Sequence, residues 1–327
     1  MDSKFAAEFA SPPSQYRGAP FWAWNGRLDP EELRRQIRIL HRMGLGGFFM
    51  HSRVGLDTPY MGERWMECVA ACIDEAEKLD MQAWLYDEDR WPSGAAGGLV
   101  TRNPKYRQRQ MTMSVLTKPS DLAWTKDVLA VFTAKVSGDR ATDVVRLARG
   151  SRPRALAEGH SLLVFRESTV PCSDWYNGYT YLDTMSREAV AEFIRVTHEA
   201  YRKRFGQTFG RRVPGIFTDE PNYGNHRGSV FYGETAERVP WTPSIPREFR
   251  RRFGYDLADH LPELFLVVNG QAASRARWQF HELLTALFVD AFSKQIGRWC
   301  DRVGLEHTGH VLSEGSLGGQ TDVVGSC

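Results

Sequence analysis

The sequence lacks long apolar runs. No stretch of about 18 apolar residues occurs in the 327-residue chain, so no segment is long enough for a transmembrane helix. The beginning, MDSKFAAEFASPPS, has no apolar core of signal-peptide length. These absences predict a soluble chain that stays in the cytoplasm and does not enter membranes.

Cysteine is scarce, and neither sign of charge is in excess. The five cysteines are scattered; Cys68 and Cys72 lie four residues apart, but no second pair completes a zinc pattern. The 42 basic and 40 acidic residues leave a net charge of +2, without a basic block. We therefore expect buried or free thiols and no nucleic-acid partner.

Aromatic residues are abundant, with 10 Trp, 11 Tyr and 18 Phe. Flat aromatic faces are typical of sugar-binding clefts, but a large aromatic core explains the same composition. The composition alone leaves both interpretations open.

Strand and helix patterns alternate along the chain. A helix is predicted over 28–44, because Asp29 can cap it, Pro30 fits its first turn, Glu32 completes a capping box and Gly44 suits its end. The predicted strand GGFFMHSR is continuously apolar, which is typical of parallel sheets covered on both faces. Five strands of this α/β pattern are predicted. They occupy 19–26, 46–53, 81–94, 213–220 and 305–315, with helices between them.

Two stretches interrupt this alternation. Alternating runs between Lys105 and Asp183, such as VLAVFTAKV, predict an inserted antiparallel β subdomain. A second excursion, rich in Gly, Pro and aromatics, runs over 222–274. The predicted domains are residues 1–104 with three βα units, the insertion 105–183, and the barrel continuation 184–327.

Five strands and four helices in this order predict the first part of a (β/α)8 barrel, truncated before strands six to eight. An open doubly wound sheet is the alternative, but its glycine fingerprint after the first strand is missing. We expect the chain to be a fragment, and the reading frame downstream of the Cys327 codon would test this.

Polar and aromatic side chains gather at the predicted strand ends, where α/β proteins place their working groups. Such a set suits a polyhydroxylated ligand. Its predicted sugar-binding members are Trp24, Asn25, His51, Arg53, Asp87, Asp89, Arg90, Trp91, Asp219 and His310.

Two glutamates at neighbouring strand ends suggest glycoside hydrolysis, which needs one protonated and one charged carboxyl group. Glu220 ends the fourth strand, and Glu314 follows the fifth. Pro221 is expected to hold Glu220 in extended backbone angles. Aromatic faces such as Trp24 or Trp91 would favour its protonated form.

The stretches PFWAWNG, GGFFMHSR, YDEDRWPSGAAGG, GIFTDEP and HTGHVLSE resemble family-106 glycoside hydrolases, over about residues 20–320. The resemblance implies an α-L-rhamnosidase-like enzyme on a (β/α)8 barrel, acting on a plant or bacterial glycan or glycoside. It implies inversion with Glu220 as acid and Glu314 as base. It also implies a bound calcium, although no cofactor is required by the residues themselves and no ligands can be assigned. Family members continue well beyond the equivalent of Cys327.

Two other classes stay open. His51, Asp87, Asp219 and His310 could surround a divalent metal, as in barrel hydrolases and isomerases. His198 and Glu199, within a helix, are interpreted as a solvated face. A non-catalytic carbohydrate-binding remnant is the third class. The sugar, the linkage and the oligomeric state do not follow from the sequence.

Overall fold

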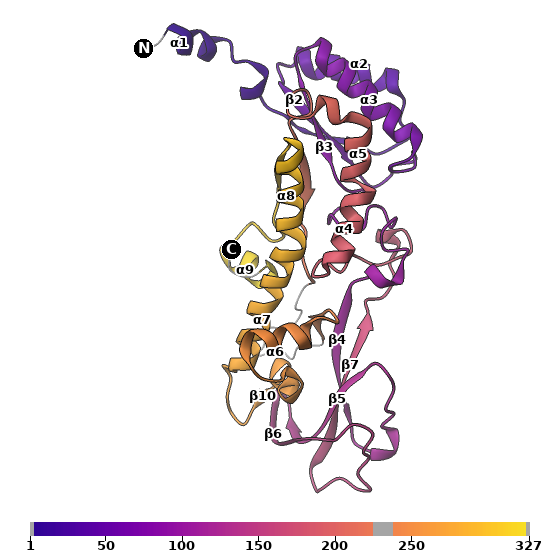
Figure 1. Ribbon diagram of the computed structural model, residues 1–327, viewed down its shortest axis with the longest axis vertical. Coiled ribbons are helices and arrows are strands. Elements are labelled where there is room, and N and C mark those ends of the chain that lie inside the picture. Colours follow the sequence, from indigo (N-terminus) through magenta and orange to yellow (C-terminus); the bar gives the residue numbers. More distant parts are fainter. Residues whose placement is uncertain (1–2, 225–237, 325–327) are drawn as a thin grey trace.

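The computed structural model describes residues 3–224 and 238–324. The molecule is elongated, with one sheet at each end of its long axis (Figure 1). A five-stranded sheet and helices α2 and α3 occupy one end, and a six-stranded sheet occupies the other. Part of the predicted excursion, residues 225–237, lies outside the described residues, as does Cys327.

The five-stranded sheet is parallel throughout, in the order β1-β2-β3-β8-β11. This order follows the chain, and helices lie between consecutive strands, as the sequence predicted. The strands are β1 (Phe21–Trp24), β2 (Gly47–Ser52), β3 (Gln82–Tyr86), β8 (Gly215–Asp219) and β11 (Glu306–His310).

Helix α2 (Pro30–Arg42) joins the first two strands and begins at the predicted cap. The Asp29 carboxylate accepts from the amides of residues 31 and 32. The predicted capping box does not form, because the Glu32 carboxylate instead accepts from Arg35 and Gln36. Gly44 follows the helix at a φ of 87°, the left-handed conformation that glycine adopts at low cost.

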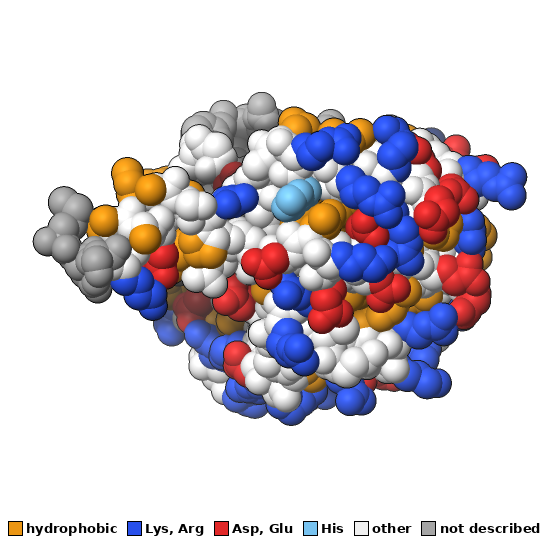
Figure 2. Space-filling model, turned by 90° about the horizontal axis from the view of Figure 1, so that it is seen from above, with side chains coloured by type: hydrophobic (Ala, Val, Ile, Leu, Met, Phe, Trp, Pro, Cys, Tyr) orange, Lys and Arg blue, Asp and Glu red, His pale blue; other side chains and the backbone are white. Residues whose placement is uncertain are grey.

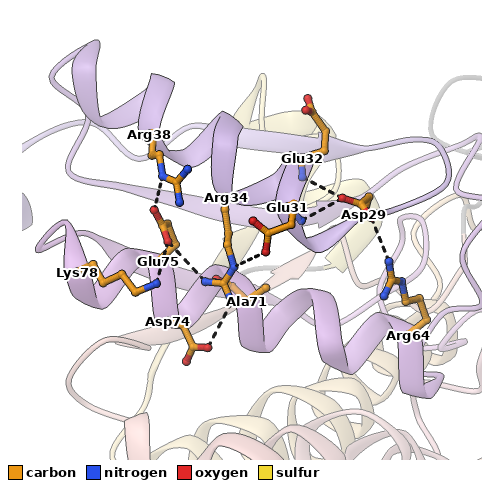
Figure 3. Close-up of polar contacts among 10 residues, drawn as sticks. All are labelled: Asp29, Glu31, Glu32, Arg34, Arg38, Arg64, Ala71, Asp74, Glu75 and Lys78. Atoms are coloured by element: carbon orange, nitrogen blue, oxygen red, sulfur yellow. Dashed lines mark hydrogen bonds and ion pairs between the residues drawn. The ribbon is translucent and has the colours of Figure 1, made fainter.

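Helix α3 (Glu63–Lys78) packs beside α2, and a buried carboxylate joins the two (Figure 3). The Glu75 side chain is 3% exposed. It accepts from Arg38 Nε at 2.6 Å and from Lys78 Nζ at 3.2 Å, and Arg34 Nη1 lies 3.5 Å away. Three cations therefore compensate one carboxylate that burial would otherwise disfavour.

Two of the helices predicted between the strands are interrupted in the structure. The first divides into α4 (Arg187–Val196) and α5 (His198–Phe205) at Thr197, whose hydroxyl donates to the Phe193 carbonyl at 2.8 Å. The second consists of α7 (Arg275–Phe288), a π-helical turn (Val289–Ser293) and α8 (Lys294–Val303). Apolar periodicity predicted both helices but not their breaks.

The six-stranded sheet has the order β10-β6-β5-β7-β4-β9. Its pairs are antiparallel except β10 with β6, which is parallel. The predicted strand over VLAVFTAKV is confirmed as part of β5. The sheet draws β9 and β10 from beyond residue 183, so two separate stretches of chain build it, and the predicted domain division stays a prediction. The strands are β4 (Arg109–Leu116), β5 (Val128–Ser137), β6 (Arg140–Arg146), β7 (His160–Thr169), β9 (Arg238–Trp241) and β10 (Val267–Val268).

One continuous hydrophobic core connects the two sheets. It includes Trp65 between the parallel sheet and its helices, and Phe165 and Phe265 beside the second sheet. Helix α6 (Ile245–Phe253) contributes Phe249. Many of the aromatic side chains are therefore part of the hydrophobic core.

The N-terminal segment leaves the body as an arm that carries α1 (Ser3–Ala10) (Figure 1). Figure 2 looks down on the parallel-sheet end and shows basic and acidic side chains interspersed over it, with apolar side chains on the arm. Helix α9 (Leu317–Val324) follows β11. No helix in the described ranges is long and apolar enough to cross a membrane.

Candidate active site at the strand ends

Asp219 lies at the centre of a polar cluster formed by the ends of four parallel strands. Its side chain is 7% exposed and contacts residues from β2, β3 and β11. Tyr86 donates its hydroxyl to Oδ2 at 2.9 Å, His51 Nε2 lies 3.6 Å from Oδ2, and His310 Nδ1 lies 3.5 Å from Oδ1. The structure thus brings together three predicted site residues, Asp219, His51 and His310.

Strand register explains this meeting. Asp219 pairs directly with His310, and Tyr86 pairs with Phe217 two residues before Asp219. Since side chains alternate between the faces of a strand, these residues share one face of the sheet. Phe217 also packs edge-on against His310, with ring centres 5.0 Å apart. The cluster therefore has an apolar floor and a polar rim.

Glu220 follows Asp219 at the end of β8, and its amide donates to the His310 carbonyl at 3.1 Å. Its φ is 46°, so the prediction that Pro221 holds it in extended angles is wrong. A side chain at positive φ is strained, and such residues concentrate at functional sites. Burial, the Asp219 charge and the Glu314 charge raise the pKa of Glu220, while His310 opposes the rise.

Glu314 lies in the turn after β11. Its side chain is 52% exposed, and its Oε1 lies 4.0 Å from His310 Nε2. His310 therefore stands between Asp219 and Glu314, with one ring nitrogen towards each carboxylate. The two glutamates proposed from the sequence are near enough for the Glu314 charge to act on Glu220.

Glu88, which was not among the predicted site residues, organises the loop after β3. Its buried carboxylate accepts four backbone amides, from Asp89, Gly94, Ala96 and Gly97, at 2.6–2.8 Å. Burial raises the pKa of Glu88 to about 8, and the four amides oppose the shift. The GAAGG run was the available signal, because chain that wraps a carboxylate this closely favours glycine.

Three predicted site residues of the same loop, Asp89, Arg90 and Trp91, contact residues 175–177 of the predicted β-rich insertion. Asn177 donates to Asp89 Oδ2 at 3.2 Å and accepts from Arg90 at 2.8 Å. Trp175 donates its indole N–H to the Trp91 carbonyl at 2.7 Å, and the two indole rings lie 5.2 Å apart. Trp175 and Asn177 were not among the predicted site residues, since only the tertiary fold brings residues 173–181 to this loop.

Two predicted sugar-binding residues, Trp24 and Asp87, lie on the face of the parallel sheet that the helices cover, opposite to Asp219. Trp24 is 2% exposed and packs edge-on against Trp65 of α3 at 5.0 Å. Asp87 is 0% exposed and receives the hydroxyls of Ser93 and Thr218. A bound sugar would reach neither, because helices cover both. Asn25 and Arg53 are exposed beyond the ends of β1 and β2.

His198 was predicted to face solvent and does not. It is fully buried, with Nε2 3.6 Å from Asp87 Oδ2 and Nδ1 2.7 Å from the Thr197 hydroxyl. Burial, with help from His307, lowers the pKa of His198 to about 3, so the ring is neutral at physiological pH. Burial raises the pKa of Asp87 to about 7, against the two donated hydroxyl groups.

The four residues considered as ligands of a divalent metal do not lie together in the structure. Asp87 lies behind the sheet, apart from His51, Asp219 and His310 on the other face. Within the described parts of the chain, no group of three or more His, Cys, Asp or Glu side chains is placed to hold a metal ion.

Comparisons with known proteins show which family the chain belongs to. A family model of α-L-rhamnosidases, glycoside hydrolase family 106, matches residues 154–318, about half of the chain. The matched region contains Asp219, Glu220, His310 and Glu314. The chain belongs to this family.

A solved rhamnosidase from Novosphingobium sp. PP1Y shares the fold of this family-106 chain, with a TM-score of 0.59 and 15% sequence identity. The match covers 94% of the present chain and 47% of the rhamnosidase. The chain therefore spans about half the length of that relative. The comparison with curated proteins gives no match.

Proposed function

We propose that this chain forms the first five βα units of a (β/α)8 barrel that hydrolyses an α-L-rhamnosidic bond. Membership of the family supports the reaction class. The order of the five parallel strands, which follows the chain, supports the barrel, since a (β/α)8 barrel adds its strands one by one. Its substrate would be a carbohydrate or glycoside that carries terminal rhamnose.

Glu220 is proposed as the general acid that protonates the leaving oxygen. The observation that carries this assignment is the position of Glu220 at the end of β8, next to Asp219 and hydrogen-bonded to His310, where burial and two neighbouring carboxylates raise its pKa. A raised pKa keeps the carboxyl protonated nearer to neutral pH, as general acid catalysis of glycoside cleavage requires. The hydrogen bond from the Glu220 amide to the His310 carbonyl and the positive φ of Glu220 fix the direction in which its side chain leaves the backbone.

Glu314 is proposed as the general base that activates water on the opposite face of the sugar. It is the more exposed of the two glutamates, which suits an ionised carboxylate with access to water. Inversion requires a gap of roughly 6.5–9.5 Å between the two carboxyl groups, which leaves room for that water.

Asp219, with His51 and His310 beside it, is proposed to bind sugar hydroxyls. Its carboxylate already accepts from Tyr86, and two ring nitrogens lie within 3.6 Å. A ring of acceptors and donors around an apolar floor suits a deoxysugar, which has hydroxyl groups on part of its ring and a methyl group.

The calcium that the family resemblance implies finds no ligand set among the described residues. Calcium takes six to eight oxygen ligands, whereas the His310 ring lies between the Asp219 and Glu314 carboxylates and the His51 ring lies beside Asp219. We therefore derive no step through calcium.

Paired substitutions test the two roles. Glu220→Gln should lower hydrolysis of ordinary rhamnosides by roughly two to four orders of magnitude and of rhamnosides with very acidic leaving groups much less. Glu314→Gln should lower both about equally, because water activation does not depend on the leaving group. Kinetics on the two substrates, with sugar binding measured separately, would distinguish the roles.

Equal losses on both substrates for Glu220→Gln would show that it is not the acid. NMR of the first product adds an independent check, since inversion releases β-L-rhamnose. A chain that binds rhamnosides but never turns them over would favour the non-catalytic carbohydrate-binding alternative.

A further inference from the structure

A second polar cluster lies behind the parallel sheet, on the side that the helices cover. Asp87, Ser93 and Thr218 have relative exposures of 0%, 0% and 3%. His198 approaches the same carboxylate from α5, and His307 Nε2 lies 3.0 Å from Thr218 Oγ1. The proposed reaction uses none of these five side chains.

Hydrogen bonds connect Asp87 to the last two residues of β8, directly to Thr218 and through Ser93 to Asp219. The Ser93 hydroxyl donates to Asp87 Oδ1 at 2.5 Å, and the Thr218 hydroxyl donates to Oδ2 at 2.6 Å. Ser93 also exchanges bonds with the Asp219 backbone: its Oγ accepts the Asp219 amide at 2.8 Å, and its amide donates to the Asp219 carbonyl at 2.7 Å. Both oxygens of the Asp87 carboxylate are therefore linked to β8, Oδ1 through Ser93 and Oδ2 through Thr218.

We propose that Asp87 is a positioning residue, which holds the end of β8 through Ser93 and Thr218 and so fixes Asp219 and Glu220 at the proposed active site. This inference rests on the function proposed above. Direct contact with substrate does not fit, because Asp87 is fully buried on the helix side.

The strained backbone at Glu220 explains why the end of the strand needs such support. A residue at positive φ persists only where its surroundings hold it, and Thr218 and Asp219 immediately precede it. Misplacement of a catalytic group by about 1 Å can cost on the order of 100-fold in rate. The buried Asp87 carboxylate, with its two short hydrogen bonds from hydroxyl groups, is suited to prevent such a misplacement of Glu220.

Kinetics of the full 327-residue chain give the first test. Asp87→Asn and Thr218→Val should lower kcat on an aryl α-L-rhamnoside by about 10- to 100-fold, with KM within about threefold. Thr218→Ser keeps the hydroxyl and should restore most of kcat. Glu75→Gln, which alters a buried carboxylate in the helix layer, is the matched control and should leave kcat unchanged.

Hydrogen exchange of single amides gives a test that needs no activity. The Asp219 and Ser93 amides should exchange at least about tenfold faster in folded Asp87→Asn than in Glu75→Gln, because their mutual bonds loosen. Unchanged exchange at both amides would overturn the positioning role, whatever the enzyme does. Faster exchange with unaltered kcat would show that the strand end is held but does not serve this reaction.

Discussion

Glu220, the proposed general acid, has a backbone conformation that works against stability. Its φ of 46° places a β-carbon where L-residues crowd their own carbonyl groups, which costs roughly 1–2 kcal/mol. Glycine avoids this cost, yet the position holds a glutamate between Asp219 and Pro221. A functional demand on the carboxyl group is a physical reason for keeping the strain.

Replacing this side chain should therefore separate stability from activity. Glu220→Gly and Glu220→Ala both remove the carboxyl group, but only glycine relieves the positive φ. We expect the glycine variant to be more stable than the alanine variant by about 1 kcal/mol, and both to lose activity. Urea unfolding of the two variants measures the difference. An alanine variant as stable as the glycine variant would contradict strain at this position.

At the scale of elements, one buried charge lies in the contact between α2 and α3. The Glu75 carboxylate forms ion pairs with Arg38, Lys78 and Arg34, as Figure 3 shows, and its side chain is buried. The hydrogen bond from Arg38 is the largest cause that lowers the pKa of Glu75 below its ordinary 4.5, while burial opposes it. The ionised form is thus the one that the folded helices stabilise.

This pKa shift predicts how stability depends on pH. Because the folded pKa is lowered, the contribution of Glu75 is present above about pH 4.5 and is lost as the pH falls through the folded value. Glu75→Gln should lower the unfolding free energy by about 1–3 kcal/mol at pH 7, and its difference from wild type should shrink towards pH 3.

Denaturant unfolding at several pH values measures this effect. Glu77→Gln in the same helix is the control, since Glu77 is exposed and should change stability by less than about 0.5 kcal/mol. A Glu75→Gln deficit that stays constant down to pH 3 would show that lost packing, rather than charge, causes it.

At the scale of the whole molecule, the parallel sheet has two open edges. Strands β1 and β11 end the sheet on either side, and neither has an outer neighbour among the described residues. Phe21, on the face of β1 that carries the site, is 44% exposed and touches Phe217 of β8. Unpaired edges next to exposed aromatic rings are typical sites of association.

We therefore expect the isolated chain to associate or to be poorly soluble. Light scattering over a concentration series and the shape of the thermal melt would measure this. Adding charge at the edge, as in Phe21→Lys, should reduce association more than Phe5→Lys on the N-terminal arm, which lies away from the sheet. A monomeric protein with a sharp cooperative melt would refute the expectation.

The sequence by itself determined the α/β alternation, the five parallel strands and the strand-end position of Asp219, Glu220 and His310. For the first four strands these features depend on local patterns, namely apolar runs, the Asp29 cap and polar residues placed where the runs stop. Strand β11, with the sequence EHTGH, is polar, and its prediction depended on its place after a long helix. Periodicity along the chain reports such features directly, and so the acidic pair after β8 could be identified without coordinates.

Only the tertiary structure decided which face each side chain takes and which distant segments meet. Trp24 and Asp87 stand at strand ends, as predicted, but turn to the helix layer, and His198 turns inward to join Asp87. The positive φ of Glu220 overrode the preference that Pro221 imposes locally. Contacts between residues far apart in sequence, such as Trp91 with Trp175, depend on packing that no local pattern encodes.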